Sequence, residues 1–198
     1  VFFDFGTPHD EAFGKECHPN CDCGRFMEIG NSVFMQYIKR AAGSFKELSQ
    51  KNVDFGGGLE RIAAALNDNP DVFAVDLLWP VIVDIASVSG KSYEGNERAF
   101  RVVVDHVRAA VFMAVEGVTP SNTDRGYLLR RLLRRAIFHS DRLGLPEYRL
   151  AAIARNFGEL YADVYPEVSK QRDLVVATLH EEEDRFRKTL ARGLREFE

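Results

Sequence analysis

A run of glycines stands directly before an arginine-bearing segment with the composition of a helix. Residues 54–61 are Asp-Phe-Gly-Gly-Gly-Leu-Glu-Arg, and the apolar residues 62–66 follow at once. Glycine lets a ligand approach the backbone closely, and a guanidinium group at Arg61 suits a phosphate or a stacked ring. The pattern favours a nucleotide site; a simple strand-to-helix turn is the alternative. The spacing excludes a P-loop and a dinucleotide fingerprint.

A second candidate is the basic segment 126–137, which repeats two apolar and two basic residues. At helical spacing the apolar residues should fill one half of a helix, and these are Leu128, Leu129, Leu132, Leu133, Ala136 and Ile137. The basic half consists of Arg130, Arg131, Arg134 and Arg135, with Arg125 upstream. A strip of arginines without acidic neighbours favours a phosphate backbone. The alternative is a solvated face whose arginines pair with carboxylates such as those at 181–184.

A loop with three cysteines offers a third candidate. Cys17, Cys21 and Cys23 have His18 adjacent and His9 nearby. Three thiols and an imidazole are enough for tetrahedral zinc. The spacing matches no familiar zinc finger or knuckle, so reduced thiols in a surface loop are favoured over zinc.

Composition limits the class of protein. The chain has 198 residues, 45% hydrophobic and 28% charged, with a net charge of −4. It can form one sizeable core or two modest domains, and broad non-specific nucleic-acid binding is disfavoured. No apolar run reaches the roughly 20 residues that cross a bilayer, so no membrane partner is expected. An odd cysteine count suits a reducing, cytoplasmic compartment. Because the chain lacks a starting Met, we expect a fragment of a longer protein.

The order of expected elements indicates an α+β protein. The front half should hold a strand over 1–5, a loop over 6–24, and two strands or one bent strand over 25–39. A short strand at 52–54 should lead into the glycine run, and a helix over 72–88 should break or kink at Pro80. The back half should be helical, over 99–116, 123–143, 148–164 and 166–197. The predicted domains are 1–95 and 96–198.

Several motifs together resemble the alanyl-tRNA synthetases, a family of class II aminoacyl-tRNA synthetases. The matching stretches are Val1–Gly6, Arg25–Ile29 with Asn31, Val33–Tyr37, Val53–Asp54, Gly58–Ala64, Asp105–Ala109 and Gly117–Arg131. The resemblance implies the C-terminal part of a class II catalytic domain, an antiparallel sheet with helices, followed by a helical domain that reads the tRNA acceptor stem. It also implies a reaction in which alanine and ATP form an adenylate, pyrophosphate leaves, and the alanyl group passes to the tRNA 3′ end.

The resemblance assigns ATP-site roles to five residues. Arg61 would be the class II motif 3 arginine that contacts ATP, and Gly56 and Gly58 would allow its close approach. Glu28 and Asn31 match positions that contact Mg²⁺-bound ATP. An arginine at the phosphates and a carboxylate–amide pair at the metal suit adenylate formation. From the residues alone, a surface ion-pair partner is the alternative role of Glu28.

Three further roles concern alanine and tRNA. Asp54 would pair with the alanine ammonium group, and Val33 would line the pocket for the methyl group. Asn122 matches the asparagine that helps recognise the acceptor-stem G·U pair. From the residues alone, Asp54 also fits a turn, and Asn122 also fits a helix cap.

Some positions depart from the family pattern. Gly30, Ser32, Phe55 and Gly57 stand where the family usually has tryptophan, an aliphatic residue, a small polar residue and methionine. Class II motif 1 and the first part of motif 2 would precede Val1, and the editing domain, which carries the family's known zinc site, would follow Glu198. We therefore expect an alanine–tRNA ligase fragment that does not aminoacylate alone. A non-catalytic acceptor-stem binding module from the same family is the alternative.

Overall fold

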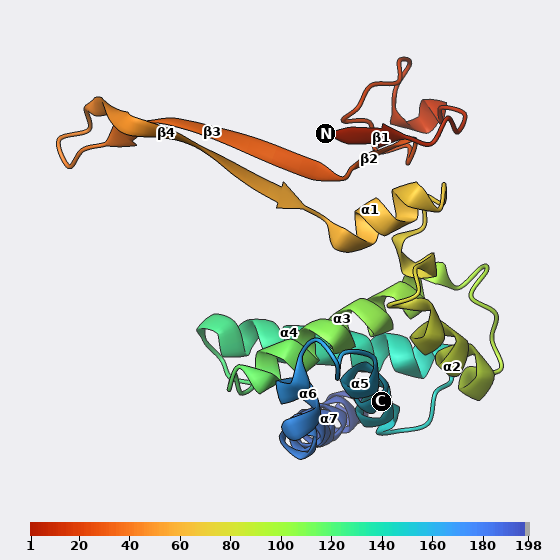
Figure 1. The fold of residues 1–198 in the computed structure, drawn as a ribbon. Helices are drawn as coiled ribbons and strands as arrows, with labels where there is room; N and C mark the ends of the chain where they lie inside the picture. Colours follow the sequence, from red (N-terminus) through yellow and green to blue (C-terminus); the bar gives the residue numbers. More distant parts are fainter. Residues whose placement is uncertain (197–198) are drawn as a thin grey trace. The chain divides into compact units, whose positions relative to one another are not determined.

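The β-structure consists of two separate antiparallel hairpins. The structure, a computed structural model, describes residues 1–196. It divides into two compact units, residues 1–76 and residues 77–198. In the first unit β1 (Phe2–Asp4) pairs with β2 (Phe26–Glu28), and β3 (Gly30–Lys39) pairs with β4 (Phe45–Gly57) (Figure 1). Helix α1 (Leu59–Leu66) and two 3₁₀ helices, η1 (Glu11–Phe13) and η2 (Val72–Ala74), complete this unit.

Strand β4 is longer than the sequence predicts. A short strand at 52–54 was expected, but β4 begins at Phe45 and includes Gly56 and Gly57. The stretch 45–51 is mostly polar, and it forms a strand because a turn closed by Arg40 N–H and the Ser44 carbonyl (2.8 Å) pairs it with β3. The loop over 6–24 and the interruption between two strands near Gly30 agree with expectation, apart from η1.

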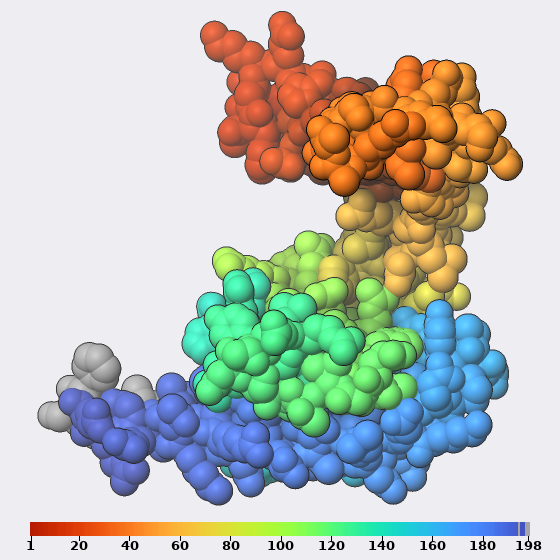
Figure 2. Space-filling view, turned by 90° about the vertical axis from the view of Figure 1, so that its left-hand side faces the viewer, coloured from red at the N-terminus to blue at the C-terminus, as the bar shows by residue number. Residues whose placement is uncertain are grey.

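The second unit contains only helices. They are α2 (Trp79–Ser89), α3 (Glu97–Val115), α4 (Asp124–Leu143), α5 (Arg149–Leu160), α6 (Pro166–Lys170) and α7 (Arg172–Arg195). Fully buried side chains from all six form its core, including Ile85, Phe100, Leu133, Phe157, Val168 and Leu179. Figure 2 shows these helices as one packed body. The α+β class is therefore confirmed.

Three sequence expectations need correction. The expected break near Pro80 is present, but 72–88 is not one helix: η2 ends at Ala74, α2 begins at Trp79, and Pro80 stands in its first turn, where its missing N–H is tolerated. The last helical stretch is broken at Gln171 into α6 and α7. The units divide after Asp76, earlier than the predicted boundary at 95, because α2 buries Ile85 in the helical core and Asp84 binds Arg149 (2.6 Å).

The length and hydropathy of the helices show whether any of them could span a membrane. Over the described residues, none of the helices is both long and apolar enough to cross a membrane.

Candidate functional site

The glycine run and Arg61 border one pocket in the first unit. Its volume is about 250 Å³, and its lining residues are Glu28, Ile29, Gly30, Asn31, Gly56, Gly57, Gly58 and Arg61. Residues 28–31 come from the β2–β3 junction, residues 56–58 from the end of β4, and Arg61 from the first turn of α1. The structure thus brings together all five residues predicted to contact ATP, although they lie up to 33 positions apart.

Gly58 allows the Arg61 side chain to lie over the start of α1. A Cβ atom at Gly58 would stand 3.1 Å from Arg61 Cδ and 3.3 Å from Arg61 Cγ, closer than side chains normally approach. The Arg61 Nη1 group donates a hydrogen bond to the Glu28 carbonyl oxygen (3.0 Å). This is the only hydrogen bond of the Arg61 side chain to a described residue, so its other N–H groups are available to a ligand in the pocket that Arg61 lines.

The two residues predicted to bind the substrate alanine, Val33 and Asp54, are direct neighbours across the β3–β4 hairpin. Val33 pairs with Asp54, and Asn31 pairs with Gly56. Paired residues project from the same face, and alternate pairs share that face, so these four positions lie together. A Cβ atom at Gly56 would meet nothing within 4 Å, which leaves bare backbone opposite Asn31. The arrangement places a carboxylate beside a small apolar surface.

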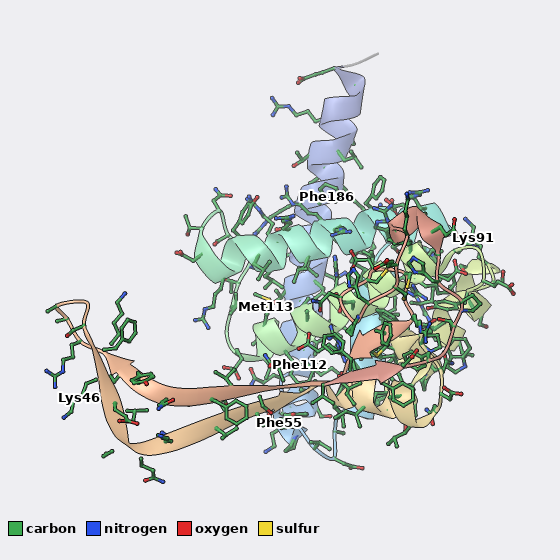
Figure 3. All side chains as sticks on the ribbon, turned by 90° about the horizontal axis from the view of Figure 1, so that it is seen from above. Lys46, Phe55, Lys91, Phe112, Met113 and Phe186 are labelled. Atoms are coloured by element: carbon green, nitrogen blue, oxygen red, sulfur yellow. The ribbon has the colours of Figure 1, made fainter. Side chains whose placement is uncertain are left out.

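The residues that depart from the family pattern lie on the other face of the hairpin. Ser32 pairs with Phe55, and Gly30 pairs with Gly57. The Phe55 ring lies over both glycines: a Cβ atom at Gly30 would stand 3.0 Å from Phe55 Cζ, and one at Gly57 3.3 Å from Cε1. Figure 3 shows Phe55 projecting from β4. The large residue at 55 and the absent side chains at 30 and 57 therefore fit one another.

Only some of the predicted arginines of α4 form its exposed basic surface. Leu128 was expected in the buried half but is 48% exposed. It shares i, i+3, i+7 spacing with Arg131 and Arg135, so these three residues occupy one solvent-facing stripe. Arg125, Arg131 and Arg135 make no hydrogen bond or ion pair with any side chain in residues 1–196. The core side of α4 is formed by Leu129, Leu133, Ala136 and Ile137.

The other two arginines are held within the protein. Arg134 Nε lies 2.6 Å from Oε1 of Glu182, a carboxylate that is 1% exposed, and its guanidinium stacks over Phe186 at 5.3 Å. Figure 3 shows Phe186 of α7 beside α4. Arg130 donates to Asn122 Oδ1 and stacks on Tyr127. The predicted alternative, pairing with a carboxylate of the 181–184 run, thus holds for Arg134.

Loop residues 117–122 are packed against the first turn of α4. Gly126 is buried, and a Cβ atom there would overlap Ser121 Oγ and the Thr119 carbonyl oxygen. Ser121 N–H also donates to the Gly126 carbonyl (3.0 Å). These contacts fix Asn122, whose Oδ1 is used by Arg130 and whose amide N–H₂ group makes no hydrogen bond to the described residues.

Sequence reasoning missed a second basic cluster in the helical unit. Lys91, Arg98, His139 and Arg142 help to line a pocket of about 340 Å³, and Figure 3 marks Lys91. Burial lowers the pKa of His139, and the charges of Arg135, Arg142 and Arg98 lower it further. The only sequence signal was Arg142, which continues the i+7 spacing of Arg135; Lys91 and Arg98 are too distant in the chain to reveal the cluster.

In the cysteine loop the structure replaces one predicted ligand. His9, and not His18, lies with Cys17, Cys21 and Cys23. His18 is exposed, and its carbonyl accepts the Cys21 N–H (2.8 Å) in the turn between them. The His9 side chain and the Arg25 backbone N–H lower the pKa of Cys23 to about 6.

Comparison with known proteins identifies the family of this chain. The family profile described as "tRNA synthetases class II (A)" matches residues 1–198. The chain therefore belongs to the class II tRNA synthetases of this group.

Individual relatives within this family are named Alanine--tRNA ligase. The Alanine--tRNA ligase of Desulfosudis oleivorans is 43% identical over 91% of this chain and 21% of its own length. Those of Borrelia hermsii and Thermotoga petrophila are 38% and 40% identical over 100% of this chain, and over 34% and 23% of their own lengths. The chain thus spans about a fifth to a third of these relatives.

Proposed function

We propose that this chain is part of an ATP-dependent alanine–tRNA ligase. Its first unit would carry half of the adenylate-forming site, and its helical unit would bind the tRNA acceptor stem. The observation that carries the proposal is the convergence of Glu28, Asn31, Gly56, Gly58 and Arg61 on one pocket. The name shared by the relatives supports the choice of alanine.

The adenylation step needs little covalent chemistry from the protein. A carboxylate oxygen of alanine attacks the α-phosphorus of ATP, and the bond to pyrophosphate breaks. Negative charge grows on the phosphate oxygens, and Arg61 would stabilise it from the pocket wall. Carboxylate and amide oxygens are the donors that Mg²⁺ accepts, so Glu28 and Asn31 fit a Mg²⁺-bound ATP. The metal would neutralise phosphate charge.

Alanine recognition would use the next residue pair on the same hairpin face. The Asp54 carboxylate would bind the ammonium group, and Val33 would contact the methyl group. In the second step a ribose hydroxyl of the tRNA 3′ end attacks the alanyl carbonyl carbon, and AMP leaves. The protein's part in that step is to hold the acceptor stem.

The ligase assignment is tested by alanine-dependent pyrophosphate exchange. The longest natural polypeptide that contains these residues should exchange pyrophosphate with alanine and ATP. Residues 1–198 alone should not aminoacylate tRNA, because both faces of the β3–β4 hairpin are exposed, with Phe34 78% accessible on one face and Val33 49% on the other. We propose that further segments of the ligase cover them. Robust alanylation by the 198-residue chain would contradict this expectation.

The RNA-binding role rests on Arg125, Arg131 and Arg135. Replacing Arg131 and Arg135 together with alanine should weaken acceptor-stem binding by the 198-residue chain. It should also lower the slope of log affinity against log salt by about 2, one for each lost phosphate contact. Fluorescence anisotropy at several salt concentrations measures both.

A matched control removes two arginines from α7. Arg185 and Arg192 are exposed and already paired with Glu181 and Glu196, so their replacement should leave the slope unchanged. Equal slopes for the α4 variant and the parent would show that Arg131 and Arg135 form a solvated face and do not bind phosphate.

A non-catalytic tRNA-binding module is the second candidate. The packing of Phe55 over Gly30 and Gly57 supports it, because these are positions at which the sequence departs from the expected family pattern beside the pocket. Acceptor-stem binding without alanine-dependent exchange would select this candidate.

A further inference from the structure

The loop between β1 and β2 gathers four ligand atoms at one point. The Sγ atoms of Cys17, Cys21 and Cys23 and a ring nitrogen of His9 all lie within 4.8 Å of one another. Cys17 Sγ and Cys23 Sγ are 3.7 Å apart, and Cys21 Sγ lies 3.8 Å from His9 Nδ1. A bonded pair of sulfurs would be separated by about 2.05 Å, so the thiols are free.

These separations match the edges of a metal tetrahedron. With a zinc–sulfur distance of about 2.3 Å, the ligands of a tetrahedral site stand roughly 3.8 Å apart. A zinc–nitrogen distance of about 2.1 Å shortens the mixed edge only slightly. A bound ion would therefore require movements of no more than about 1 Å from the separations observed here.

The orientation of His9 leaves its ring nitrogen ready for coordination. His9 Nε2 lies 2.8 Å from the Gly14 carbonyl oxygen, which can only accept a hydrogen bond. Nε2 therefore carries a proton, and Nδ1 is the ring nitrogen that faces the thiols, 3.8 Å from Cys21 Sγ. Histidines that bind metal commonly donate their second ring N–H to a carbonyl in this way, which fixes the tautomer.

The loop has little else to hold it together. Cys21, at 6% exposure, is the only buried residue between Val1 and Ile29. At the base of the loop Arg25 donates to both carboxylate oxygens of Asp4 (2.8 Å each). Within the loop the remaining hydrogen bonds are short-range turns. A segment of this size without an apolar core is the kind that a structural metal stabilises.

We propose that Cys17, Cys21, Cys23 and His9 form a structural zinc site. Three thiolates and one imidazole form a closed tetrahedral donor set, with no position left for a catalytic water. The ion would fix the β1–β2 loop, and through β2 it would steady Glu28 at the edge of the pocket. The site does not depend on the proposed ligase function.

Metal content of the 198-residue chain tests the site directly. Protein purified under reducing conditions, with three thiols confirmed by titration, should bind one equivalent of zinc by elemental analysis. Cobalt(II) in place of zinc should give the visible bands of a tetrahedral thiolate complex. Less than about a tenth of an equivalent after incubation with zinc would overturn the proposal.

His18 supplies a matched control for His9. His9→Ala should weaken zinc binding at least tenfold and alter the cobalt spectrum, whereas His18→Ala should keep one equivalent and the parent spectrum. The opposite result would show that the ligand set is wrong. Hydrogen exchange gives a second readout: a chelator should speed exchange in residues 6–24 and leave the helical unit unchanged. Unchanged exchange in the loop would refute a structural role.

Discussion

Replacing Arg61 with alanine is expected to lower alanine-dependent pyrophosphate exchange by about 100- to 1,000-fold. That range is typical for the loss of one positioned donor to a developing negative charge. Folding should be almost unaffected, because Arg61 is exposed and makes one hydrogen bond, to the Glu28 carbonyl. Exchange assays on the polypeptide tested for ligase activity, with thermal unfolding in parallel, measure both effects.

Two further variants show whether the guanidinium fork itself is needed. Arg61→Lys keeps the charge but loses the planar donor pair, so exchange should recover only in part. Arg40 is an exposed arginine in the β3–β4 turn, far along the hairpin from the pocket, and Arg40→Ala should exchange like the parent. Full exchange by Arg61→Ala would show that this arginine does not act on ATP.

The sequence located the Gly58–Arg61 side of this pocket because that signal is local, whereas Glu28 and Asn31 were assigned only through the family resemblance. Glycine before a helix, followed by an arginine in the first turn, already determines where Gly58 and Arg61 must lie. Pairing of β3 with β4, between residues 25 positions apart, is what brings Asn31 beside Gly56. Element types in the helical unit were equally predictable, since the apolar periodicity of α3 and α4 is strong.

Long-range pairing was beyond the reach of the sequence. The choice of His9 over His18 depends on the path of an irregular loop, in which the residue next to Cys17 in sequence points to solvent. The Arg134–Glu182 contact joins residues 48 positions apart. Helical spacing alone gave Arg130, Arg131, Arg134 and Arg135 the same role. Strand β4 was underestimated because pairing with β3, and not apolar alternation, makes 45–51 a strand.

The largest expected loss of stability comes from replacing Arg134, the α4 arginine that pairs with a buried carboxylate. Arg134→Ala removes the partner of Glu182, whose side chain is 1% exposed. A buried carboxylate left without its cation destabilises a fold by about 3 kcal/mol or more. Urea denaturation followed by far-ultraviolet circular dichroism should therefore show a large fall in the unfolding free energy of the helical unit. Arg131→Ala, on the exposed stripe of the same helix, should stay within about 0.5 kcal/mol.

A double variant separates the pair from the packing around it. Arg134→Met with Glu182→Leu replaces both charges by apolar side chains of similar length, so no buried charge is left alone. It should be more stable than Arg134→Ala, although it has lost the same ion pair. If Arg134→Ala were as stable as the parent, Glu182 would not need its partner, and Arg134 would return to the RNA-binding set. The expected pattern instead assigns Arg134 to folding and leaves Arg131 and Arg135 for phosphate.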